Sequence, residues 1–132
     1  MTAPQVLPHV DAVQAALAAG GLTVYLGGAP PRPADRYAVL YPEPGQAVRE
    51  SLADARTHWS GVVTITSVAT TAEQALWVAD KIRAALAGPL VVQGRVAWRP
   101  EELGGPPLAR DDDVTPPLFY APVQYRLQSI PS

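Results

Sequence analysis

Two segments of the chain repeat apolar residues at the spacing of a helix, and they predict the two helices of the protein. In the first, Val10, Val13 and Leu17 fall on one side of a helix that covers residues 8–19. Gly20 follows its last turn, as glycine does at the ends of many helices. This segment therefore predicts a short helix with one buried side.

The second helical segment, TTAEQALWVADKIRAALAG, runs from Thr70 to Gly88, and Thr70 or Thr71 is placed to cap its start. At 100° per residue, its expected apolar face consists of Ala72, Ala75, Leu76, Ala79, Ile82 and Leu86. Trp77 lies almost opposite that face, among charged residues. A helix packed on a core predicts no large apolar side chain there, so Trp77 needs a separate explanation.

Strands are predicted where β-branched and aromatic residues gather between turn residues, namely at residues 22–26, 37–41, 62–68 and 90–98. The final strand shows the clearest alternation, with Ala121, Val123, Tyr125 and Leu127 on one side and Gln124, Arg126 and Gln128 on the other. Alternation of this kind is typical of a sheet that is covered on one face only. The polar or proline-rich segments 43–57 and 99–117 are expected to form long connections.

Together these elements predict an α+β fold, in which a mainly antiparallel sheet packs against two helices. Their order along the chain is helix, strand, strand, strand, helix, strand, strand. Fifteen prolines and ten glycines, concentrated between these elements, predict long loops. The 132 residues suit one domain, covering 1–132, and no repeat or second domain is expected.

Composition narrows the possible partners and chemistry. The net charge of −2 gives no general electrostatic reason to bind nucleic acid or lipid, and the chain has no cysteine for disulfides or thiolate metal sites. The N-terminal sequence shows no signal-peptide pattern, and no apolar run reaches the roughly 20 residues of a membrane span. No membrane partner, metal or cofactor is expected.

The residues that carry catalysis in other proteins are sparse here. His9 and His58 lack the spacing of metal ligands, and structural positions explain both. Ser60 follows His58 by two residues on the same side of a predicted strand, which is the basis for an alternative as a small hydrolase. No nucleophile elbow or phosphate-binding loop accompanies the pair. The sequence therefore predicts a protein that is not an enzyme.

The densest charge cluster is RDDDVT, which contains Arg110, Asp111, Asp112 and Asp113. Carboxylates bind hard cations, but neighbours in an extended chain point alternately and rarely chelate one ion. The run is expected to be either a solvated loop tip or a contact to an arginine of a neighbouring subunit.

Two stretches, YAVLYPEPG and VVTITSVATTAEQALWVADKIRAAL, carry a resemblance to a known family. With the helix before them and the strand FYAPVQYRLQSI after them, the chain resembles the tail terminator (tail completion) proteins of long-tailed bacteriophages. The likeness extends from about Val6 to Ile130. The proline-rich segment from Arg99 to Pro117 departs from the family pattern, so its contacts cannot be transferred.

The resemblance implies a structural protein of the virion, located at the head-proximal end of the tail and assembled in the host cytoplasm. Such proteins form a homo-hexameric ring that caps the tail tube, ends its polymerisation and meets the head-completion (neck) proteins. It implies partners in the tail tube protein and the connector proteins, with DNA passing through the lumen without sequence-specific binding. It implies no catalytic residues and no cofactor.

A ring offers one explanation of Trp77, because tryptophan is enriched at the centres of interfaces and a ring joins two different patches of each subunit. The other explanation lies within one subunit, where the loop from residue 43 to 57 folds over the Trp77 side chain. Within that loop, Arg49, Glu50, Asp54 and Arg56 form a mixed-charge segment. This segment is expected either to line the lumen of the ring or reach the tail tube, or to be a solvated loop.

Three alternatives to a tail terminator stay open on the sequence. One is another head–tail component, such as a head-closure or adaptor ring or a tail-tube-like protein. The second is the hydrolase based on His58 and Ser60. The third is a ligand-binding module with a pocket beneath the proline-rich loops.

Overall fold

The structure is a computed structural model that describes residues 4–48 and 57–132. Within these residues the chain forms two helices and eight strands. In chain order they are α1 (Val6–Ala19), β1 (Val24–Leu26), β2 (Arg36–Pro42), β3 (Gln46–Val48), β4 (His58–Ala69), α2 (Ala72–Ala85), β5 (Arg95–Ala97), β6 (Glu101–Gly104), β7 (Ala109–Asp111) and β8 (Leu118–Pro131). The predicted α+β class is confirmed.

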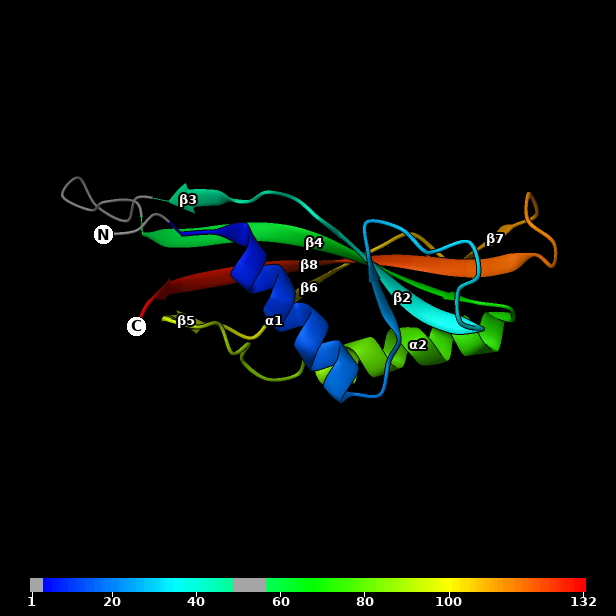
Figure 1. Ribbon diagram of the computed structural model, residues 1–132, viewed down its shortest axis with the longest axis horizontal. Coiled ribbons are helices and arrows are strands. Elements are labelled where there is room, and N and C mark those ends of the chain that lie inside the picture. The colour runs from blue at the N-terminus through cyan, green and yellow to red at the C-terminus, as the bar shows by residue number, and fades with distance from the viewer. Residues whose placement is uncertain (1–3, 49–56) are drawn as a thin grey trace.

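The two longest strands, β4 and β8, form the middle of a single sheet and run along the length of the molecule (Figure 1). They pair antiparallel without a break from Trp59 opposite Ser129 to Ala69 opposite Phe119. β2 and β3 pair with the free edge of β4, while β5, β6 and β7 share the free edge of β8. Among the described strands only β1 runs parallel to its neighbour, β2.

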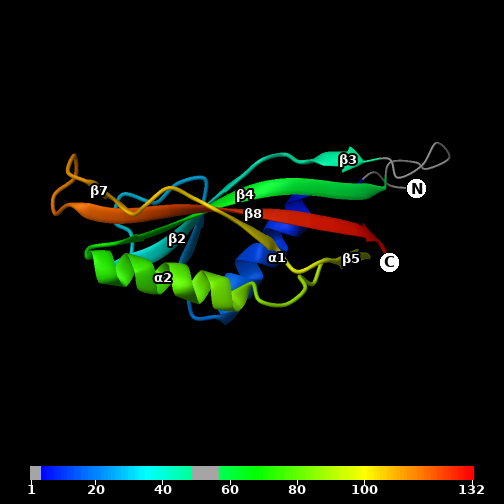
Figure 2. The ribbon, with the colours of Figure 1, turned by 180° about the vertical axis from the view of Figure 1, so that it is seen from behind.

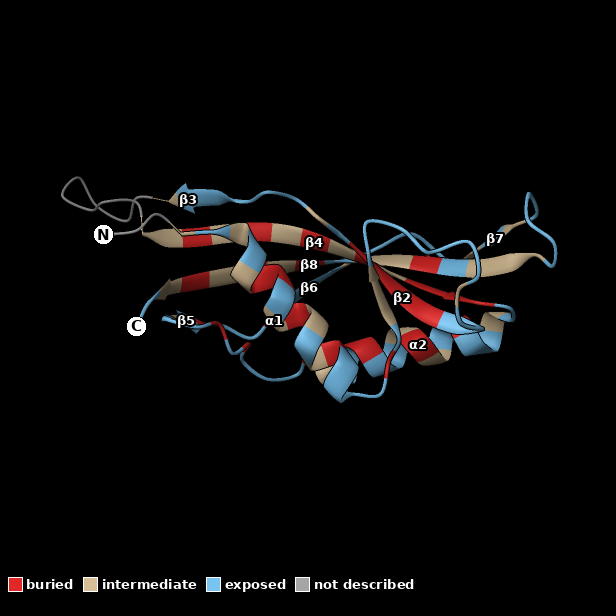
Figure 3. Ribbon diagram, in the orientation of Figure 1, coloured by how far each residue is buried: buried red, intermediate tan, exposed pale blue. Residues whose placement is uncertain are grey.

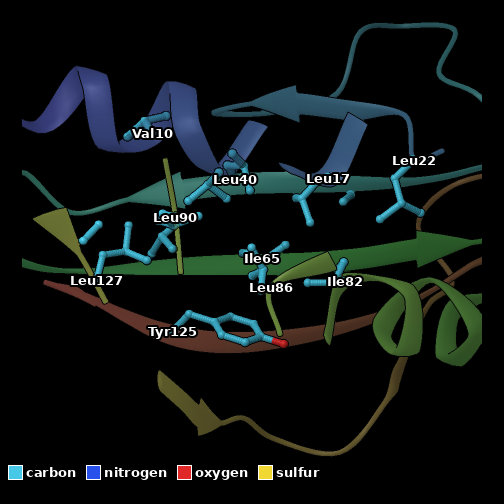
Figure 4. Packing of buried hydrophobic residues seen from close by; sticks show 14 of the residues in the cluster. Val10, Leu17, Leu22, Leu40, Ile65, Ile82, Leu86, Leu90, Tyr125 and Leu127 are labelled. Carbon is cyan, nitrogen blue, oxygen red and sulfur yellow. The ribbon is translucent and has the colours of Figure 1, made fainter. Parts of the chain in front are cut away.

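Both helices lie against the same face of this sheet, as the two opposite views show (Figures 1 and 2). The buried side chains between helices and sheet form one core, in which Leu17, Leu40, Ile65 and Ile82 meet (Figure 4). Buried residues accordingly alternate along β4 and β8 (Figure 3). The predicted alternation of the last strand is confirmed, since Tyr125 is buried among the core side chains.

The local signals for the helices also agree with the structure. Val10, Val13 and Leu17 are buried on α1, and Gly20 forms its C-cap. At the start of α2 the hydroxyl of Thr71 accepts a hydrogen bond from the backbone N–H of Gln74, at 3.2 Å. This capping satisfies one of the N–H groups that a helix leaves without an internal partner.

The predicted apolar face of α2 was wrong at one position. Leu76 was expected to cover the sheet, but its side chain is 51% exposed, whereas Val78 is fully buried. The buried stripe instead contains Ala75, Val78 and Ile82. The reason is tertiary: α2 touches α1 and β2 as well as β4 and β8, so the contact area is centred between these neighbours.

The two expected long connections contain strands that the pattern missed. β3 lies in the first, and β6 and β7 lie in the second. Conversely, the strand expected at residues 90–98 is reduced to β5, although Leu90 and Val92 before it are buried. Short segments pair here because the long edges of β4 and β8 present backbone groups that need partners. Such pairing depends on a distant strand, not on local periodicity.

Trp59 is the largest buried side chain at the β3 end of the sheet. Its indole ring stacks on the ring of His9 from α1, with 3.9 Å between the ring centroids. On the other side it lies against Gly45 and Gly61, and a Cβ atom at Gly61 would come within 2.6 Å of the indole Cη2. Two glycines therefore make the room that the tryptophan occupies.

We predict that Gly61→Ala destabilises the protein by about 2 kcal/mol, because the added methyl group overlaps the buried indole. The free energy of unfolding from urea denaturation, followed by tryptophan fluorescence, measures the loss. Gly88→Ala is the matched control, since nothing lies within 4 Å of a Cβ at that position. Equal stability of the two variants would contradict the packing described for Trp59.

Candidate assembly surfaces

Trp77 is half-buried on α2, and part of its ring packs against the core. The guanidinium of Arg36, at the start of β2, lies over the ring with its Cζ 3.8 Å from the centroid, and the Lys81 ammonium is 5.3 Å away. Arg36 also donates a hydrogen bond to the side chain of Gln74, at 2.6 Å. A cation–π contact and the core thus both hold Trp77 within its own chain.

A shallow hollow of about 280 Å³ lies beside Trp77, formed by residues 21–23 and 34–36. Leu76, the residue before Trp77 in the sequence, has an exposed side chain. An interface role of Trp77 stays a prediction. Most of the loop proposed to cover it, residues 49–56, lies outside the described residues.

The acidic run forms a turn at one end of the sheet, where β7 leads to β8. The carboxylate of Asp112 pairs with the Arg110 guanidinium at 2.5 Å, and that of Asp111 accepts the backbone N–H of Asp113 at 3.0 Å. Among the described residues, no three histidine, aspartate or glutamate side chains gather as metal ligands. This loop therefore carries three carboxylates and one arginine, and its net charge is negative.

The other charged segment of interest falls on residues that the structure does not describe. Arg49, Glu50, Asp54 and Arg56 all lie outside the described residues, and their predicted contacts stay predictions. The described residue before them, Val48, pairs with β4 at the end of the sheet opposite the acidic run (Figure 1).

His58 and Ser60 share the face of β4 that points away from the helices, and both are partly exposed. His58 stacks with Trp98 at a centroid separation of 5.8 Å. Ser60 lines a separate shallow hollow with Glu43, Gln46 and Arg126, in which His58 takes no part. His58 and Ser60 therefore lie on one face of β4 beside different neighbours, and the hydrolase alternative stays a prediction.

The same face carries a row of uncharged polar pairs between the two central strands. Ser60 lies opposite Gln128, and Thr64 lies opposite Gln124. Arg126, between these glutamines, is paired with Glu101 of β6 at 3.0 Å. No helix of the described residues covers this face (Figure 2). The polar pairs occupy its middle and one end, and a smaller apolar cluster of Tyr37, Val39 and Val68 lies toward the other end.

A polar cluster that the sequence did not reveal is buried beneath α1. His9, only 1% exposed, places Nδ1 2.6 Å from the carbonyl of Gln5 and Nε2 2.6 Å from the hydroxyl of Ser129. A carbonyl only accepts, so Nδ1 carries the proton and Nε2 accepts the Ser129 O–H. Arg95 donates to the same hydroxyl at 2.6 Å and to the carbonyl of Thr57.

This network holds His9 in its neutral form. Burial, and secondarily the positive charge of Arg95, lowers its pKa below the ordinary value of 6.5, although the hydrogen bond to Gln5 acts in the opposite direction. A second proton would put a donor at Nε2 in place of the acceptor that Ser129 uses. The signal that could have found this cluster is a tertiary one, because Ser129 is 120 residues from His9.

The fold with these surfaces is similar to that of solved proteins. One, from the virion of a native gene transfer agent particle, is 20% identical with a TM-score of 0.63, covering 94% of each chain. A second is 17% identical with a TM-score of 0.50, covering 91% of this chain and 94% of the other. The likeness shows the fold alone. No family model and no curated protein matches the sequence.

The gene transfer agent protein matches along nearly its whole length, so the similarity is to a complete chain of that particle. No described helix is long and apolar enough to cross a membrane.

We predict that acidification destabilises the protein through His9. Because the folded-state pKa is lowered, the unfolded chain takes up the proton first, and stability is lost as pH falls below about 6.5. Urea denaturation between pH 5 and 7.5 measures this slope. His9→Gln should flatten it, and an unchanged slope in His9→Gln would contradict the assignment.

We also predict that Trp77→Ala lowers the free energy of unfolding by about 2 kcal/mol, since the half-buried ring leaves the core and Arg36 loses its π partner. Thermal or urea denaturation of dilute protein measures it. Leu76→Ala is the matched control on the same helix and, being exposed, should change stability by less than about 0.5 kcal/mol. Equal effects would place Trp77 outside the core.

Proposed function

We propose that this chain is a structural virion protein of a phage-like particle, and specifically a ring-forming tail terminator. The observation that carries the proposal is the shared fold with a protein of the gene transfer agent virion over 94% of both chains. The sequence resemblance to tail terminators rests on different evidence, namely the strand and helix patterns, and it agrees with that fold.

The surfaces suit assembly better than catalysis. The described residues gather no metal ligands, and His58 and Ser60 lie beside different neighbours. Instead the molecule is long, carries the acidic turn of Asp111 to Asp113 at one end of its sheet, and leaves one sheet face free of helices. Copies arranged around an axis would place the polar pairs of that face, Ser60 with Gln128 and Thr64 with Gln124, toward a lumen that DNA crosses without being bound. We propose this arrangement for the ring.

In the proposed role, the ring binds the last layer of the tail tube, blocks addition of further tube subunits and offers its other side to the head-completion proteins. This requires a heterologous interface, because only contacts between two different patches close into rings of more than two copies. An adaptor or head-closure ring would use the same interface but a different position in the particle.

We predict a ring of about six copies when purified protein is concentrated or added to tail tubes, detected by light scattering and electron microscopy. Deleting the gene should give particles with overlong tails, because nothing ends tube growth. Tails of normal length with unattached heads would favour the adaptor alternative. A protein that neither assembles nor binds tube ends would overturn the tail terminator proposal.

A further inference from the structure

A hollow of about 400 Å³ lies between the C-terminal end of α2 and the start of β6. Its apolar lining comes from Leu86, Ala87 and Pro100, and its charged lining comes from Arg83, Arg99, Glu101 and Glu102. Tyr125 of β8 completes it. The hollow thus combines an apolar floor with a polar rim, as binding sites for a protein loop do.

Tyr125 is the uncharged polar residue that lines this hollow. The residue as a whole is only 3% exposed. In Figure 4 the hydroxyl is directed away from Leu127. Burial, with a smaller contribution from the Glu102 carboxylate, raises the pKa of Tyr125 to about 12. The group therefore keeps its proton and offers a donor to the hollow.

Ion pairs neutralise most of the rim. The Arg83 guanidinium holds Glu102 at 2.8 Å and lowers the pKa of that carboxyl, while Arg126 holds Glu101 at 3.0 Å. Arg99 is exposed and has no ion-pair partner in the described part of the chain. The hollow consequently presents one guanidinium and one O–H donor, a combination that complements a carboxylate.

The chain itself carries a loop of the complementary kind. The turn from Asp111 to Val114 exposes aspartates beside an apolar side chain, Val114, which is 38% exposed. The pair of Asp112 with Arg110 is itself largely exposed, so little free energy is lost when that carboxylate changes partner. The acidic and apolar groups of this turn match the exposed Arg99 guanidinium and the apolar floor of the hollow.

One copy cannot bring the two features together. The acidic turn precedes Phe119, which pairs with Ala69 just before α2 begins, whereas the hollow lies where α2 ends. Six residues of β8 separate Phe119 from Tyr125, a distance of about 20 Å. Figure 1 shows the β7–β8 turn at one end of the molecule and the end of α2 near its middle. A contact between them must join two copies.

We propose that the hollow around Tyr125 and Arg99 receives the Asp111–Val114 loop of a neighbouring copy, as the contact that closes the ring. The proposal rests on the proposed function. It makes the interface heterologous, with the sheet end of one subunit bound at the middle of the next. A carboxylate of the loop accepts hydrogen bonds from Tyr125 and Arg99, while Val114 packs toward Ala87 and Pro100.

Disulfide trapping tests the contact directly, because the chain has no cysteine. The double variant Ala87→Cys with Val114→Cys should, on mild oxidation, give a ladder of cross-linked species that ends at the ring size on a non-reducing gel. Either single variant should give no species larger than a dimer. The matched pair, Ala87→Cys with Ala47→Cys, uses an exposed residue of β3 at the opposite end of the sheet and should give no ladder. No excess of the first pair over the matched pair would overturn the contact.

Charge exchange provides the second test. Arg99→Glu or Asp112→Arg should each raise the protein concentration needed for half-maximal assembly about tenfold, and the two together should restore most of it. Tyr125→Phe should weaken assembly in the same direction, with circular dichroism confirming that the variants are folded. The control Arg32→Glu reverses the charge of an exposed arginine away from the hollow. Equal effects of Arg32→Glu and Arg99→Glu, or no rescue, would contradict the proposal.

The outcomes separate this contact from the function. A ring that assembles while the cysteine pair stays uncross-linked would keep the tail terminator proposal and reject the contact. A ladder from a protein that never caps a tail would keep the contact and reject the tail role. A wild-type chain that stays monomeric and a pair that does not cross-link would reject both.

Discussion

The antiparallel ladder between β4 and β8 is the constraint on which the rest of the structure depends. Both strands are long, and every other described strand except β1 pairs with one of them. The ladder joins residues 59–69 to residues 119–129, so its formation requires closure of a large loop of chain. Its length also gives the molecule its extended shape and two widely separated ends.

The buried polar cluster links the helix layer to one end of this ladder. His9 brings α1 onto Trp59 of β4 and Ser129 of β8, and Arg95 adds β5 to the same hydroxyl. A buried hydrogen-bond network of this kind is favourable only when its members are satisfied, which requires neutral His9. Stability and protonation are therefore coupled at the end of the sheet opposite the acidic turn.

The distribution of surfaces suits the proposed assembly. Both helices occupy one face and cover the main core within the subunit, whereas the other face combines polar pairs between β4 and β8 with a smaller apolar cluster of Tyr37, Val39 and Val68. In the ring that we propose, the acidic turn at one sheet end of each copy meets the hollow beside α2 of the next copy, where Arg99 is exposed. Arg99 and Tyr125 acquire their proposed role only through their positions beside α2.

The sequence by itself determined the two helices, the five main strand regions and the buried side of β8, because these follow from periodicity within a few residues. The strand predicted at residues 90–98 is the exception, since its extent was too long. Tertiary structure alone decided the strands β3, β6 and β7, the exposure of Leu76 and the meeting of His9 with Ser129. Each of these depends on a neighbour far away in the chain. Strand pairing and side-chain burial depend on the distant segment that supplies the missing hydrogen bond or contact. The local sequence pattern does not identify that segment.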